Sequence, residues 1–294
     1  MHCLNLKLTY NCTNHCSFCF SSRLSGNEIT LEGLKRAVEV GYKSGCREIV
    51  ISGGEPTLVP GFIREILELS ERLGYEKYIL QTNGSGIASN PKLLSYLDSI
   101  AIKKDFFISF SVQGHSATLH NSISGSEGAF EKLISAIEEV KKSRCKIYTN
   151  TVVSKLNISH LKEIALLLLP YKPVIMQFSM MHLTHPSDIC TTLIETSIAI
   201  KKLKDIVPST ILKTEGIPFC LMHGMEYCVG ESFWPNKLDL YNYEDHYMSE
   251  FTQLGSGMRA KKEFCNRCIM NEICMGVWRE HISELKKLNI QPIR

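Results

Sequence analysis

A regular alternation of strand-like and helix-like segments is the feature that most restricts the fold of this chain. Short apolar runs with the length of buried strands cover residues 4–8, 49–51, 78–82, 106–111, 146–153 and 174–179. Between them, apolar residues recur at helical spacing over residues 31–45, 62–73, 91–100, 130–140 and 158–169. Such alternation predicts an α/β fold with a parallel sheet and right-handed crossovers. Ligands of such sheets lie at the carboxyl ends of the strands.

Length and composition narrow the class of protein. The 294 residues have room for one large domain and one small one, and a net charge of +3 is too small to indicate a nucleic-acid partner. Without a run of 18 apolar residues or a signal-peptide profile, the chain is expected to be cytoplasmic and to have no membrane partner. The 12 cysteines therefore favour metal binding over disulfides.

Three closely spaced cysteines follow the first strand-like run. Cys12, Cys16 and Cys19 have C-x3-C-x2-C spacing, and Phe18 precedes the last of them. Iron–sulfur clusters are held by such thiolates, normally four of them. Three ligands would leave one iron of a four-iron cluster open, as catalytic metal sites do. A zinc site is the alternative, although the fourth ligand is missing locally.

A second motif follows the next strand-like run, where the chain reads Gly53-Gly54-Glu55-Pro56. Glycines at the end of a strand let backbone approach a ligand closely, and the Glu55 carboxylate can accept a hydrogen bond from an ammonium group. An ordinary turn between a strand and a helix is the alternative, because Gly and Pro punctuate many loops.

Together the two motifs resemble those of the radical SAM superfamily. The resemblance implies a partial (β/α)6 barrel, a [4Fe–4S] cluster on the three cysteines, and S-adenosylmethionine (SAM) bound at the open iron. The Gly-Gly-Glu-Pro turn would bind the methionine amino group. A reductant such as flavodoxin or ferredoxin would supply the electron that cleaves SAM. The resulting 5′-deoxyadenosyl radical would abstract hydrogen from a substrate. No catalytic side chain is assigned by the resemblance.

The ends of the third and fourth strand-like runs add two expected cofactor contacts. Asn83 follows the third run, and Ser111 ends the fourth, where it resembles a family serine that lies near the cofactor ribose. The family arginine that reaches the cofactor carboxylate is replaced by Ser124, so the partner of that carboxylate is left open. The cofactor-binding prediction comprises Phe18, Gly53, Gly54, Glu55, Pro56, Asn83 and Ser111.

A second cysteine group follows residue 205, where the alternation stops. Cys265, Cys268 and Cys274 have C-x2-C-x5-C spacing, which resembles the SPASM and twitch extensions that bind auxiliary iron–sulfur clusters. One auxiliary [4Fe–4S] cluster is expected, with Cys220 as the preferred fourth ligand and Cys228 as its competitor. A zinc ribbon is the alternative. The predicted domains are residues 1–205, the radical SAM core, and residues 206–294, the auxiliary-cluster domain.

The motifs leave the substrate open. Relatives with such extensions often crosslink, epimerise or oxidise ribosomally synthesised peptides, so maturation of a peptide is our first expectation. Oxidation of a small molecule by a radical SAM dehydrogenase is the second. An iron–sulfur protein that only transfers electrons is the third, and the Gly-Gly-Glu-Pro motif counts against it, because a carrier needs no cofactor-binding turn. Oligomeric state is not indicated.

Overall fold

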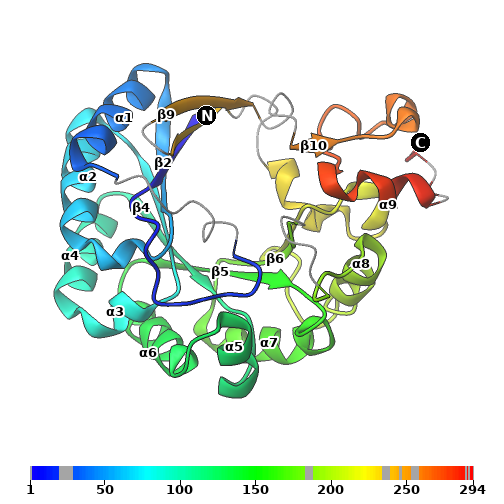
Figure 1. The fold of residues 1–294 in the computed structure, drawn as a ribbon, viewed down its shortest axis with the longest axis horizontal. Helices are drawn as coiled ribbons and strands as arrows, with labels where there is room; N and C mark the ends of the chain where they lie inside the picture. The colour runs from blue at the N-terminus through cyan, green and yellow to red at the C-terminus, as the bar shows by residue number, and fades with distance from the viewer. Residues whose placement is uncertain are drawn as a thin grey trace.

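A curved parallel sheet with helices on its outer side forms the centre of the computed structural model (Figure 1). The structure describes residues 2–19, 29–182, 188–233, 239–244, 247–252, 258–288, 290, 292 and 293. The strands lie in the order β7-β6-β5-β4-β3-β2-β1, and each neighbouring pair is parallel. The expected α/β partial barrel is thus confirmed.

The strands begin and end close to the predicted positions. They are β1 (His2–Lys7), β2 (Cys46–Ser52), β3 (Lys77–Thr82), β4 (Asp105–Ser111), β5 (Lys146–Val153), β6 (Ile175–Met180) and β7 (Leu212–Glu215). The helices are α1 (Leu31–Lys43), α2 (Pro60–Leu73), α3 (Ser85–Ser89), α4 (Pro91–Ala101), α5 (Ala117–Ser124), α6 (Ala129–Lys141), α7 (Leu161–Leu168), α8 (Leu193–Lys201) and α9 (Ile282–Lys287). Two caps bound these helices: the Thr30 side chain accepts from Gly33 N–H at the start of α1, and Gly74 ends α2 with a φ of 101°.

The two faces of the sheet differ in polarity because successive side chains of a strand point to opposite sides. In β6, Met176 and Phe178 belong to the hydrophobic core, whereas Gln177 and Ser179 lie on the other face. The same alternation places Tyr148 and Asn150 of β5 on the face opposite Ile147. The helices therefore cover an apolar face, and the inner face of the barrel carries polar side chains.

The sheet continues past the region in which the sequence alternates. β7 pairs with β6 although it follows residue 205, and β8 (Asp239–Glu244) pairs in parallel with β1. β9 (Tyr247–Thr252) is antiparallel to β8. The sequence LKTE of β7 is too short and too polar to read as a buried strand. The predicted boundary between residues 205 and 206 remains a prediction.

The C-terminal segment is built mostly from short elements. A two-stranded ribbon joins β10 (Arg259–Ala260) to β11 (Val277–Trp278), and α9 follows it. Cys265 lies in a 3-10 turn over Glu263–Arg267. No helix among the described residues has the length and apolar character needed to cross a membrane.

Backbone contacts fix the path of the chain after β1. Gly54 N–H donates to Thr9 C=O at 2.7 Å, and Glu55 N–H donates to Asn11 C=O at 2.8 Å. Gly53 has a φ of 130°, and a Cβ there would lie 2.3 Å from the Thr9 oxygen. A Cβ on Gly54 would lie 2.3 Å from the Asn11 oxygen. The glycines thus allow this turn to pack directly on the backbone that leads to Cys12.

We predict that Gly53→Ala destabilises the fold by about 1–3 kcal/mol, because a side chain there is both strained and in collision with backbone. Thermal unfolding measures the effect. Gly61→Ala is the matched control, since nothing lies within 4 Å of a Cβ on this exposed residue of α2. Alanine at that position is expected to be neutral or stabilising by up to about 1 kcal/mol. Equal melting temperatures for both variants would contradict the packing role of Gly53.

Candidate active site

The three N-terminal cysteines lie together in the segment after β1. Burial, together with the nearby thiols of Cys19 and Cys12, raises the pKa of Cys16 to about 12. Burial also raises the pKa of Cys12, against the opposing effect of an N–H from Asn14 at 3.3 Å. Metal coordination is what deprotonates such thiols, so the set fits a thiolate-bound cluster. Within the described ranges, no three His, Cys, Asp or Glu side chains are grouped to hold a single metal ion. The assignment of these three cysteines as cluster ligands therefore remains a prediction.

Glu55 occupies the centre of the site and is fully buried. One carboxylate oxygen accepts from the N–H and hydroxyl of Thr57 and from the Thr82 hydroxyl at 2.8 Å. The other accepts from Asn83 N–H at 2.7 Å. Burial raises the pKa of Glu55, and these donors oppose the shift. The carboxylate thus joins the turn after β2 to the end of β3. Contact between Glu55 and the amino group of the cofactor remains a prediction. The cofactor contacts of Gly53, Gly54 and Pro56 also remain predictions.

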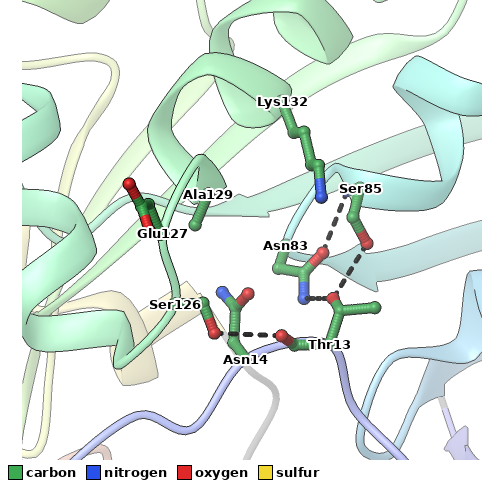
Figure 2. A pocket seen from close by; sticks show the side chains of 8 residues that line it. All are labelled: Thr13, Asn14, Asn83, Ser85, Ser126, Glu127, Ala129 and Lys132. Atoms are coloured by element: carbon green, nitrogen blue, oxygen red, sulfur yellow. Dashed lines mark hydrogen bonds between the residues drawn. The ribbon is translucent and has the colours of Figure 1, made fainter.

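Asn83 connects the end of β3 to the cysteine segment. Its side-chain nitrogen donates to Thr13 Oγ1 at 2.9 Å and lies 3.7 Å from Cys12 Sγ. Figure 2 shows the small pocket beside these residues, into which Lys132 of α6 points. The lining residues are Thr13, Asn14, Asn83, Ser85, Ser126, Glu127, Ala129 and Lys132. The structure therefore places Asn83 next to the first cysteine, as a cofactor contact requires.

The remaining predicted cofactor residues lie around the same edge of the sheet. Phe18 is half-buried in the turn before Cys19, Pro56 is buried at the start of a 3-10 turn, and Ser111 is half-buried at the end of β4. Ser124 is fully buried at the end of α5, and its C=O accepts from His15 N–H at 2.7 Å. Ser124 therefore supports the cysteine segment. The cofactor-binding roles stay predictions.

The structure separates the two competitors for the fourth auxiliary ligand. Burial raises the pKa of Cys220 to about 12, and Cys274, Cys265 and Cys268 all add to this shift because they lie close to it. Cys228 is fully buried, and its pKa responds to burial, Lys213 and Tyr227 but to no other cysteine. Cys220 thus lies within electrostatic range of the other three cysteines, whereas Cys228 does not. Their role as cluster ligands remains a prediction.

A hydrogen-bonded group on the inner face of β5, β6 and β7 was not anticipated from the sequence. Gln177 Nε2 donates to Glu215 Oε2 at 2.9 Å and to Asn150 Oδ1 at 3.3 Å, and Tyr148 donates to Gln177 Oε1. Polar residues at alternate positions of an otherwise apolar strand, as in β6, are the signal that could have identified it. The group lies across the sheet from the cysteine segment, separated by β2, β3 and β4.

Comparison with known proteins identifies the family. The model of the radical SAM superfamily matches residues 6–168, which include the cysteine triplet and the turn after β2. This chain belongs to the radical SAM superfamily. It is therefore a radical SAM enzyme, with the iron–sulfur cluster and SAM that define the family.

Curated relatives match about half of this radical SAM chain. An AdoMet-dependent heme synthase of Methanosarcina barkeri is 28% identical over 160 residues, which are 53% of this chain and 44% of the relative. A probable GTP 3′,8-cyclase of Thermococcus kodakarensis is 30% identical over 162 residues, 52% of this chain and 48% of the relative. The match thus spans less than half the length of these relatives.

Two solved structures share the fold over most of the chain. SuiB of Streptococcus suis, bound to SAM, has a TM-score of 0.71 at 17% identity and covers 96% of this chain and 74% of its own. The enzyme anSMEcpe with bound AdoMet has a TM-score of 0.69 at 17% identity and covers 95% of this chain and 89% of its own. The similarity extends beyond the barrel, into the segment that carries the second cysteine group.

We predict that Glu55→Ala lowers SAM affinity about tenfold or more and also lowers the melting temperature, while the iron content is unchanged. Four donors would lose a buried acceptor, at a cost of about 1–3 kcal/mol for each donor that stays unsatisfied. Calorimetry on the anaerobically reconstituted protein gives the affinity. Glu68→Ala removes an exposed carboxylate of α2 and is the control. A variant with wild-type affinity and stability would remove Glu55 from its central role.

Proposed function

We propose that this radical SAM enzyme modifies a peptide and that its C-terminal segment holds one auxiliary [4Fe–4S] cluster. The influence of Cys265, Cys268 and Cys274 on the pKa of Cys220, which places the four thiols in one region, supports the proposal, because four thiolates complete a cluster without an open iron. Such a cluster suits electron transfer from a substrate radical better than direct ligation of a substrate. Crystal structures of both fold relatives contain a peptide: Kp18Cys in anSMEcpe and the precursor peptide SuiA in SuiB.

A small-molecule substrate is the second candidate. The sequence relatives favour it, since a heme synthase and a GTP cyclase each match about half of this chain. The two candidates share the same chemistry at the first cluster: SAM bound there supplies a 5′-deoxyadenosyl radical. They differ in what the inner face of β5–β7 and the C-terminal segment must recognise.

The residues of this chain position the reaction. Glu55 fixes the turn after β2 against β3, and this turn fixes the backbone of residues 9–11 before Cys12. Asn83 orients the start of the cysteine segment through Thr13.

Replacement of one N-terminal cysteine should abolish SAM cleavage, because each of the three supplies a ligand. Anaerobically reconstituted wild type and Cys16→Ala would be incubated with SAM and dithionite and assayed for 5′-deoxyadenosine. The expected yield from the variant is at background. Equal yields from the two proteins would disprove the ligand assignment.

The auxiliary cluster is tested by iron content in a protein without the first cluster. A Cys12/Cys16/Cys19→Ala variant should retain about four irons per chain. Adding Cys220→Ser should remove these irons. Adding Cys228→Ser should not, because no other cysteine contributes to the pKa shift of Cys228. Zinc in place of iron after anaerobic reconstitution would make the C-terminal segment a structural zinc module and would overturn the electron-transfer role.

A further inference from the structure

The polar group on β5–β7 has hydrogen bonds of fixed direction. Glu215 Oε2 accepts from Gln177 Nε2 at 2.9 Å, and the Ser179 hydroxyl, which has one hydrogen to donate, lies 2.9 Å from this oxygen and 2.7 Å from Asn150 Oδ1. A carboxylate offers only acceptors, so the nitrogen of the Gln177 amide must face it. Gln177 Oε1 then faces Tyr148, whose hydroxyl donates to it. The carboxylate of Glu215 thereby sets the orientation of the whole group.

The donor and acceptor roles in this group also show which of its atoms have no hydrogen-bond partner. Asn150 Oδ1 is approached by Gln177 Nε2 at 3.3 Å and by Ser179 Oγ at 2.7 Å, so it is the acceptor of that amide. Among the described residues, Asn150 Nδ2 and Glu215 Oε1 have no hydrogen-bond partner. Both residues are only half-buried. The group thus offers one amide donor and one carboxylate oxygen from neighbouring positions.

A second carboxylate, Glu231, lies near Glu215 and has its own cationic partner. Burial raises the pKa of Glu231; Arg259 opposes this shift, and the nearby Glu215 carboxylate adds to it. Burial also raises the pKa of Tyr148, and Glu215 and Glu231 both add to that shift. Arg259 pairs with Glu231 at 2.9 Å, and its guanidinium lies 3.3 Å from the centre of the Trp278 ring. Glu231 Oε2 has no partner, although this side chain is only 3% exposed. Among the described residues, the Arg259 guanidinium pairs with Glu231 and not with Glu215.

Two further basic groups lie near Glu215, and their recorded hydrogen bonds are to other residues. Lys213 lies on the same face of β7, but its Nζ donates to Tyr227 C=O at 3.2 Å. His182 lies near Glu215, but burial lowers its pKa and its Nδ1 bonds Glu280 at 3.0 Å. Because Glu215 is half-buried and one of its carboxylate oxygens has no hydrogen-bond partner among the described residues, a cation from outside the chain would be favoured there.

We propose that Glu215 binds a positively charged nitrogen of the substrate, an ammonium or guanidinium group, and that Asn150 Nδ2 donates to an acceptor beside it. In a peptide these groups are a lysine or arginine side chain, or the terminal amine, next to a backbone carbonyl. SAM is also a cation, but its predicted contacts follow or lie on β1–β4, whereas Glu215 is on β7, at the opposite edge of the seven parallel strands. Identification of the cation as part of a peptide rests on the proposed function.

The first experiment needs no substrate and compares two isosteric substitutions in the reconstituted enzyme. Glu231→Gln breaks the buried pair with Arg259, so its melting temperature should fall by several degrees. Glu215→Gln removes an uncompensated charge and keeps the acceptor for Gln177 and Ser179, so its melting temperature should stay the same or rise. Equal falls in both variants would show that Glu215 is a structural partner of Arg259 and would overturn the proposal.

The second experiment identifies the source of the cation. Wild type, Glu215→Gln and the exposed control Glu163→Gln are each loaded with SAM and offered a pool of synthetic hexapeptides. Half of the pool carries one lysine or arginine at a randomised position, and half carries norleucine or citrulline there. Mass spectrometry of the bound fraction should show enrichment of the cationic members by wild type and by Glu163→Gln. Glu215→Gln should lose this enrichment by about tenfold.

Each other outcome has a distinct meaning. Peptides bound without preference for cationic members, or a preference that survives in Glu215→Gln, would overturn the role of Glu215 and leave the peptide function intact. A tenfold loss of SAM affinity in Glu215→Gln would assign the cation to the cofactor and overturn the proposal. If no peptide binds to wild type, the peptide function fails. The same selection with a pool of small amines then decides whether Glu215 binds a substrate cation.

Discussion

The buried carboxylate of Glu55 is the interaction on which the rest of the site depends. It accepts from residues of the turn after β2 and from the end of β3, so two strand ends are held in one geometry. The backbone of the same turn bonds residues 9 and 11, which lead directly to the first cysteine. An anion without solvent contact is tolerable only when such donors surround it. The position of the cysteine segment is therefore set by buried polar contacts and not by its own short sequence.

This arrangement revises the reading of the two glycines in the motif. Glycine at the end of a strand indicates a close approach of backbone, and the sequence suggested that the approaching group is a ligand. In the structure, the approaching group is the chain itself, because a Cβ on Gly53 or Gly54 would collide with the backbone oxygens of Thr9 and Asn11. A sequence pattern can thus indicate that space is needed without indicating which atoms occupy it.

The parts of the fold that the sequence predicted are those with strong local signals. β2 to β6 and their helices combine apolar periodicity with caps such as Thr30 and Gly74, and they lie close to the predicted positions. β7 was missed because four residues of mixed polarity carry no periodic signal. β8 was missed because its pairing with β1 joins segments more than 200 residues apart, which no local pattern encodes. The cysteine motifs, in contrast, carried the family, because their spacing is itself the chemical requirement.

Glu215 and its hydrogen-bond partners illustrate why a substrate-side site is harder to predict than a cofactor-side site. Each of Asn150, Gln177 and Glu215 is an ordinary polar residue in its own strand, and only the parallel register brings them together. The paired charges of Glu231 and Arg259 come from segments far apart, one after β7 and one on the C-terminal ribbon. This buried ion pair links the C-terminal segment, which carries the second cysteine group, to the edge of the barrel near Glu215. A group bound at Glu215 would therefore lie where the barrel meets the segment with the second cysteine group, the arrangement that passage of an electron between substrate and auxiliary cluster requires.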